Sequence, residues 1–142
     1  MPAIPSALVR LIERQPGSIH RTHKDLVVEE LQALGVPLDS EFGVFFLNYA
    51  ITCYRGHASD VELVDIDDGA IRFGTEFVHE VWELPQHLIC LTSCQGEGCY
   101  LYDRNNGAVL DFSLADRELF LAGSVALKWD GFFQFLIWYL AE

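Results

Sequence analysis

The first half of the chain carries its hydrophobic residues at the spacing of a helix. Between residues 42 and 49 the apolar positions follow i, i+3, i+4 and i+7, the period of one buried helix face: Phe42, Phe45, Phe46 and Tyr49. Asp39 or Ser40 is expected to cap the amino end of this helix. We therefore predict a helix whose aromatic face lies in the core.

Other helices are predicted on both sides of this one. Ser6 can cap a short helix near the start of the chain, and Thr22 with Asp25 imitates a capping box before a longer helix that Gly35 ends. Asp130 is expected to cap a closing helix. The broad apolar surface of that helix consists of Phe132, Phe133, Leu136, Ile137 and Leu140.

Between these helices the apolar positions change to a period of two, which is typical of strands. Asp67-Asp68-Gly69 and Asn105-Asn106-Gly107 are turn signals, and the second predicts a hairpin over 99–112. The short strand candidates are 60–66, 70–73, 81–84, 87–92, 99–103 and 108–112.

This order of elements predicts an α+β fold in a single domain, residues 1–142, with residues 1–24 as an N-terminal helical extension. The sheet is expected to be antiparallel or mixed, with about five to six strands. Helices would pack on it from both ends of the chain.

The net charge of the chain narrows the classes of function that it can have. The chain of 142 residues has a formal net charge of −12, which argues against binding the phosphate backbone of nucleic acids. The most apolar run, 132–141, is shorter than the ~20 residues that span a bilayer. With no apolar leader in view, we expect a cytoplasmic protein that binds neither nucleic acid nor membrane.

The acidic residues are concentrated in the middle of the chain. Residues 60–103 hold ten Asp and Glu against Arg72 alone, and such a segment can attract a cationic partner. The candidate partner-binding carboxylates are Asp60, Glu62, Asp65, Asp67, Asp68, Glu76, Glu80 and Glu83, and the candidate apolar anchors include Trp82 and Tyr54. Solubility alone is the alternative role for these charges, and a core position is the alternative for the aromatic rings.

Catalytic and metal-binding patterns are weak. Cys90, Cys94 and Cys99 follow His87, but without a Cys-x-x-Cys pair they are better explained as buried thiols than as zinc ligands. We therefore predict no catalytic residues, no metal and no cofactor. A small hydrolase or metal-dependent enzyme remains a third hypothesis.

Three blocks of residues carry a resemblance to a known family. The first is Glu30-Leu31 and Leu34-Gly35-Val36-Pro37, followed by Phe42, Phe46, Asn48 and Tyr49. The second is 88–91 and 96–103, followed by Gly107-Ala108-Val109, and the third is Trp129, Phe132, Phe133, Phe135 and Leu136. Together they resemble the SUKH superfamily, which includes Smi/Knr-type regulators of fungal cell-wall assembly and bacterial immunity proteins.

The resemblance implies a binding module. Its bacterial members are similar to antidotes that block a cognate toxin, often a nuclease, by direct contact. The expected partner is thus a cationic toxin, with a cytoplasmic regulatory or scaffold protein as the alternative and a homodimer allowed. Reversing Asp65, Asp67 and Asp68 to Lys would slow association if this edge steers the partner.

Overall fold

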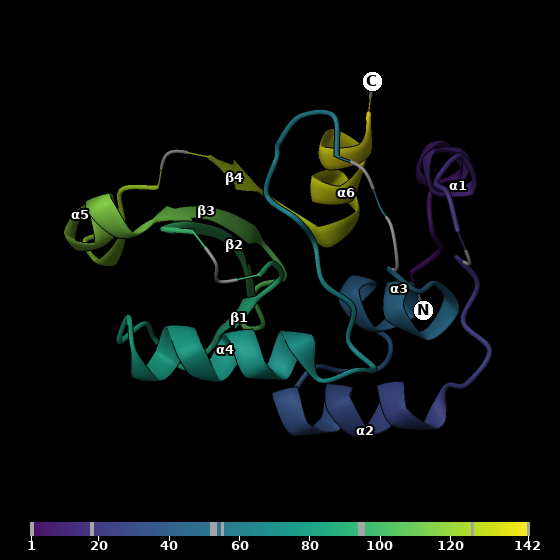
Figure 1. The fold of residues 1–142 in the computed structure, drawn as a ribbon, viewed down its shortest axis with the longest axis horizontal. Helices are drawn as coiled ribbons and strands as arrows, with labels where there is room; N and C mark the ends of the chain where they lie inside the picture. The colour runs from purple at the N-terminus through teal and green to yellow at the C-terminus, as the bar shows by residue number, and fades with distance from the viewer. Residues whose placement is uncertain are drawn as a thin grey trace.

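The computed structural model describes residues 2–17, 19–51, 54, 56–93, 96–125 and 127–141. Helices open and close the chain, and a sheet lies between them in sequence and in space (Figure 1). The elements are α1 (Ser6–Glu13), α2 (Asp25–Leu34), α3 (Glu41–Asn48), α4 (Ala70–Glu80), β1 (Leu88–Cys90), β2 (Gly98–Asp103), β3 (Val109–Ser113), the 3-10 turn η1 (Leu114–Asp116), α5 (Arg117–Leu121), β4 (Lys128–Trp129) and α6 (Phe132–Leu140).

The predicted α+β class is confirmed, but the predicted strand number is wrong. The described residues form one sheet of four antiparallel strands in the order β1-β2-β3-β4. The predicted hairpin is β2-β3, and its turn is closed by Asp103, whose side chain accepts the Asn105 N–H at 2.9 Å. Of the predicted strand 60–66, the structure retains an isolated bridge between Leu63 and Thr92.

The prediction of a strand at 70–73 is also wrong, because these residues begin helix α4. Asp67-Asp68-Gly69 starts this helix instead of turning a hairpin: Gly69 adopts φ +79°, and the Asp68 carboxylate accepts the Ala70 N–H at 2.9 Å. The predicted strand at 81–84 follows this helix and is not a strand either.

Both faces of the sheet are buried. Alternate side chains point to opposite faces, as in any strand. One face joins α1, α2, α3 and α6 in the larger core through Ile89, Leu91, Tyr100, Tyr102 and Val109. The other joins α4 and α5 in a smaller core through Leu88, Cys90, Cys99, Leu101 and Phe112.

Helix α4 also closes the outer edge of β1. The Thr75 hydroxyl accepts the Cys90 N–H at 3.0 Å, and the His79 ring nitrogen Nε2 lies 2.8 Å from the Leu88 carbonyl oxygen. These contacts satisfy backbone groups that an exposed edge strand would offer to another chain. They fix α4 against the sheet by its inner face.

The predicted helix ends are confirmed in part. Ser40 caps α3 by accepting the Gly43 N–H at 3.0 Å, and Gly35 ends α2 at φ +73°. The predicted caps of α2 and α6 are wrong, since Lys24 and Gly131 stand at those positions.

The amino-terminal segment belongs to the larger core. Leu8 and Ile12 of α1 are fully buried, and α1 packs against α6. At the other end of α6, the Glu41 carboxylate of α3 accepts the Phe133 N–H at 3.0 Å. The helices at both ends of the chain are thereby joined on one side of the sheet, and α4 lies on the other.

Candidate functional site

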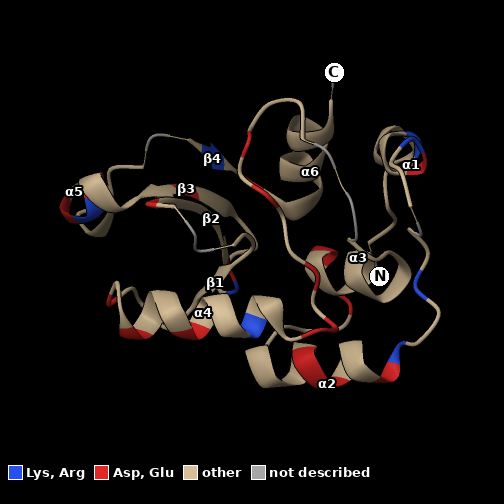
Figure 2. Cartoon of the chain, viewed as in Figure 1, with Lys and Arg blue, Asp and Glu red and all other residues tan. Residues whose placement is uncertain are grey.

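The predicted acidic residues follow the connection 60–68 and helix α4. Figure 2 shows acidic positions along this connection, where it runs down beside α6 towards α3, and along α4 and α2. Asp60, Glu62, Asp68, Glu76 and Glu80 are exposed. These five side chains are accessible to solvent, whereas Asp65, Asp67 and Glu83 have charged partners within the chain.

Two of them, Asp65 and Asp67, are held by an arginine of this chain. Both oxygens of Asp65 accept hydrogen bonds from Arg21, at 2.7 and 2.9 Å, and Asp67 lies 2.9 Å from the same guanidinium. The Arg21 side chain is 3% exposed, and it also donates to the carbonyl oxygens of Phe46 and Tyr49 at 3.0 Å each. Asp65 and Asp67 thus join the connection 60–68 to α3.

The pKa values of Arg21 and Asp67 are both shifted in this cluster. Burial lowers the pKa of Arg21 and the two carboxylates raise it, with a net upward shift. The pKa of Asp67 is also raised, first by burial and then by its hydrogen bond to Asp65 and the negative charge there, which Arg21 opposes. Asp67 therefore gives up its charge more easily than an isolated aspartate.

The two predicted aromatic anchors lie inward. Trp82 is 6% exposed and packs between Phe77 and Phe112, with ring centroids 5.3 and 5.4 Å away. Tyr54 packs against Phe45, and its hydroxyl is buried without a hydrogen-bond partner among the described residues. Burial raises the pKa of Tyr54 far above its ordinary value. Neither ring is placed to anchor a partner at the surface.

Glu83 stands apart from the other acidic residues. It has φ +55°, and its carboxylate lies 3.7 Å from Arg117 on α5. This contact directs it towards α5. Among the predicted carboxylates, Asp68 and Glu76 instead line a groove beside α4.

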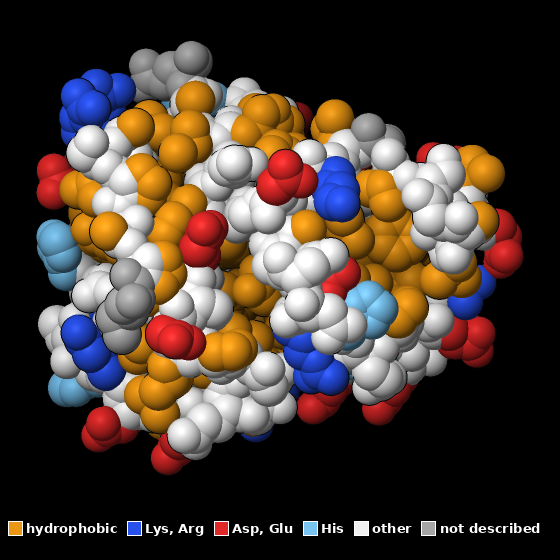
Figure 3. Space-filling view, turned by 180° about the vertical axis from the view of Figure 1, so that it is seen from behind, with side chains coloured by type: hydrophobic (Ala, Val, Ile, Leu, Met, Phe, Trp, Pro, Cys, Tyr) orange, Lys and Arg blue, Asp and Glu red, His pale blue; other side chains and the backbone are white. Residues whose placement is uncertain are grey.

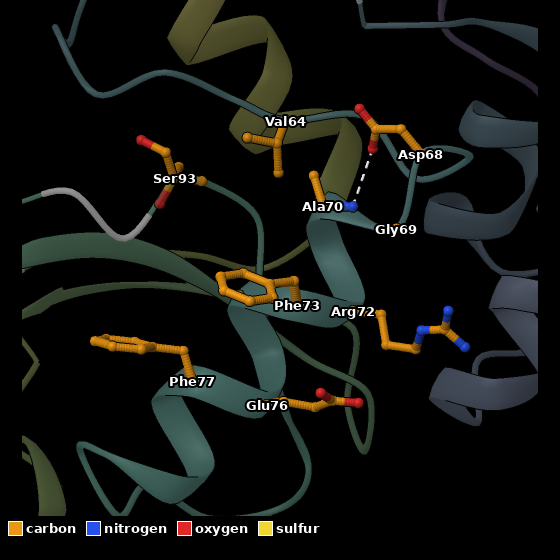
Figure 4. Close-up of a pocket in the computed structure, with 11 residues that line it drawn as sticks. Val64, Asp68, Gly69, Ala70, Arg72, Phe73, Glu76, Phe77 and Ser93 are labelled. Atoms are coloured by element: carbon orange, nitrogen blue, oxygen red, sulfur yellow. Dashed lines mark hydrogen bonds between the residues drawn. The ribbon is translucent and has the colours of Figure 1, made fainter.

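The groove has a volume of ≈ 810 Å³ and lies between α4 and the bridged segments 62–64 and 91–93 (Figure 4). Phe73 and Phe77 project from α4 in the same direction, and Val64 and Ser93 lie across from them. Its lining is completed by Asp68, Gly69, Ala70, Arg72, Gly74, Glu76 and Thr92.

Phe73 is the feature that sequence reasoning missed. Its side chain is 72% exposed, the highest value among the exposed large hydrophobic residues of the described chain. Phe73 and Phe77 are four residues apart, which places them on one helix face, and this spacing was the available signal. The prediction of a strand over residues 70–73 obscures this helical spacing.

The charges around the groove are mainly acidic. Asp68 and Glu76 supply two carboxylates, while the cation of the groove, Arg72, lies 3.3 Å from the Glu30 carboxylate. A neighbouring hollow is lined by more acidic residues, including Glu29 and Asp67. The groove is thus apolar along α4 and acidic at its rim.

With this geometry in view, the chain was compared with known proteins. No protein-family model, curated protein or solved structure matches it. The SUKH resemblance therefore stays a prediction. Within the described residues, no helix has both the length and the apolar character needed to cross a membrane.

Of the cysteine and histidine candidates in the described residues, His87, Cys90 and Cys99 do not line the groove. Cys90 and Cys99 are buried in the smaller core, Cys94 lies outside the described residues, and His87 approaches Asp103 at 3.6 Å. No group of three or more potential metal ligands occurs in the described part of the chain.

A second apolar surface lies away from the groove. From behind, hydrophobic side chains are spread over much of the face, including the side of the molecule that holds the sheet and α5 (Figure 3). Leu119 and Leu121 on α5 and Leu127 directly before β4 are 57%, 41% and 49% exposed. They provide exposed apolar residues for comparison with Phe73.

Proposed function

We propose that this chain is a non-catalytic binding protein that neutralises a cationic protein toxin by direct contact. The observation that carries the proposal is the surface of α4, where exposed Phe73 lies beside the exposed carboxylates of Glu76 and Glu80. Binding energy at protein interfaces is concentrated in a few apolar anchors, and charge complementarity speeds encounter and selects the partner. The surface of α4 offers both.

The overall charge supports the same partner class. A net charge of −12 attracts a cationic protein over a distance set by the salt concentration. Many toxins that act on nucleic acids present positive surface to their substrate, and a nuclease is the sharper form of the proposal. An acidic protein that covers such a surface would block it sterically and electrostatically.

The test is co-expression with the product of the adjacent gene. We expect that product to kill cells when expressed alone, and we expect this chain to restore survival and to purify with it as a complex. A neighbour that is harmless alone, or that kills regardless of this chain and never co-purifies, would overturn the proposal for that neighbour. A regulatory or scaffold role would then become the leading hypothesis.

A further inference from the structure

The groove beside α4 has the size of a recognition site. Its ≈ 810 Å³ falls in the range of about 300–1,000 Å³ that is typical of ligand pockets. Gly74 adds no side chain to the lining, and the buried Thr92 lies on the opposite wall. The groove therefore has room for more than one side chain of a partner.

The exposure of Phe73 is unexplained by folding alone. The inner face of α4 is already complete, because Ile71, Gly74, Thr75 and Val78 are buried against the sheet and the larger core. Phe73 stands outside this face and presents its ring to solvent at the mouth of the groove. Phe73, Phe77 and Val64 line the same groove, and exposed apolar surface that gathers at one place favours an interaction site over chance exposure.

The chemistry of the rim selects the partner. The Asp68 carboxylate is exposed at one end of the groove, where Oδ1 accepts the Ala70 N–H, and Glu76 is exposed along α4. Arg72 does not offset them fully because its guanidinium is directed to Glu30. A segment with Lys or Arg beside an apolar residue is complementary to both parts of this surface.

An added β-strand is a poorer occupant. Thr75 and His79 already engage the backbone of β1 at its outer edge, and the segments 62–64 and 91–93 bond to each other. The groove is therefore better suited to bind side chains of a partner than to pair with an added strand.

We propose that the groove is the docking site for an apolar side chain, flanked by Lys or Arg, of the cationic protein partner. This inference rests on the proposed function and names the part of the partner that this surface receives. The apolar side chain of the partner would pack on Phe73 and Phe77, and its basic neighbours would face Asp68 and Glu76.

The probe is a short synthetic peptide with one leucine between lysines, added to the isotope-labelled protein and followed by amide NMR shifts. Two further peptides replace the leucine by serine or the lysines by glutamates. We expect the first peptide to shift resonances of α4 and of 62–64, and each replacement to weaken binding by about tenfold or more. The Phe73→Ser variant should lose affinity for the first peptide to the same extent.

Leu119→Ser is the matched control, since Leu119 is 57% exposed on α5 and lies outside the groove. It should leave peptide binding unchanged, and the thermal midpoints of both variants should match that of the parent chain. Shifts that map elsewhere, equal binding by Phe73→Ser, equal binding of the serine peptide, or no binding by the first peptide would each overturn the inference.

The two proposals fail separately. If the product of the adjacent gene binds the parent chain and Phe73→Ser equally well, the groove is not the docking site and the binding function stands. If that product does not bind the parent chain while the leucine peptide occupies the groove, the proposed neutralising function fails and the docking site stands.

Discussion

Arg21 connects parts of the chain that lie far apart in sequence. Its guanidinium bonds to Asp65, Asp67 and two carbonyl oxygens near the end of α3. The side chain is almost completely buried, with 3% exposed. A buried charge is tolerated only when its donors are satisfied. Arg21 therefore works as a structural clamp for the connection that leads to α4.

Replacing Arg21 by methionine should cost about 3–5 kcal/mol in the free energy of unfolding, because two carboxylates then lose their buried cation. Urea denaturation measures this. Arg14 is exposed, so Arg14→Met should change stability by no more than about 0.5 kcal/mol. Equal effects of the two substitutions would show that the clamp contributes nothing.

Asp67 predicts a pH dependence of stability. Its folded-state pKa is raised above the ordinary 3.8, so protonation favours the folded state. The stabilising contribution is complete below the unfolded pKa and is lost as the pH rises through the folded pKa. The Asp67→Asn variant cannot ionise at this position. Its free energy of unfolding should therefore rise relative to that of the parent chain as the pH increases from 4 to neutral.

The gain should stay below about 1 kcal/mol, because Asp67 is 39% exposed and solvent screens its charge. Denaturation curves of both proteins across this pH range provide the measurement. Parallel stability profiles would contradict the assignment of the shift to Asp67.

Sequence reasoning could not have found this clamp. Arg21 and Asp65 are 44 positions apart, and only the packing of the connection 60–68 against α3 brings them together. The same carboxylates were predicted to meet a partner. Reversing Asp65 or Asp67 would disturb the fold, so charge reversal on α4, at Glu76 and Glu80, is the cleaner probe of steering.

At the scale of elements, the sequence correctly predicts the features that depend only on neighbouring residues. The Ser40 cap, the Gly35 stop and the turn of the β2-β3 hairpin depend on neighbouring residues, and the structure confirms each. Helix α6 was predicted from its apolar surface. These elements needed no knowledge of tertiary contacts.

Helix α4 was not predicted because the turn signal before it favoured a hairpin, although its buried positions, which include Ile71 and Val78, have helical spacing. Gly74 and Thr75 also lie on that face, while the large apolar side chain of Phe73 is exposed. The Asp67-Asp68-Gly69 signal, interpreted as a hairpin turn, therefore led to a strand prediction at residues that begin a helix. A tertiary contact then attaches the helix to the sheet, since the Thr75 hydroxyl accepts the Cys90 N–H.

Thr75→Val tests the attachment of α4 to β1. Valine has the shape of threonine but cannot accept the Cys90 N–H, so we expect a loss of about 1–3 kcal/mol in unfolding free energy. Thr75→Ser should retain most of the stability, and Thr22→Val, at an exposed position, should change little. Full stability of Thr75→Val would show that this hydrogen bond does not hold the helix.

At the scale of the whole molecule, the fold buries two hydrophobic cores around the sheet and leaves an acidic, partly apolar surface along α4 exposed. The sheet is covered on both faces, and the helices from the two ends of the chain close one side. The other side is covered by α4, whose outer face remains open beside the groove. The α+β class followed from sequence, but the groove depends on how α4 meets two distant segments.

The central claim is that a cationic partner binds the α4 surface, and association kinetics with the product of the adjacent gene test it most directly. The Glu76→Lys/Glu80→Lys variant should associate about tenfold or more slowly at low salt, with a weaker dependence on salt. The control variant, Glu13→Lys/Asp39→Lys, has the same net charge but alters exposed residues outside the groove, and it should retain most of the rate. Equal association rates for the two variants across a salt series would contradict the claim.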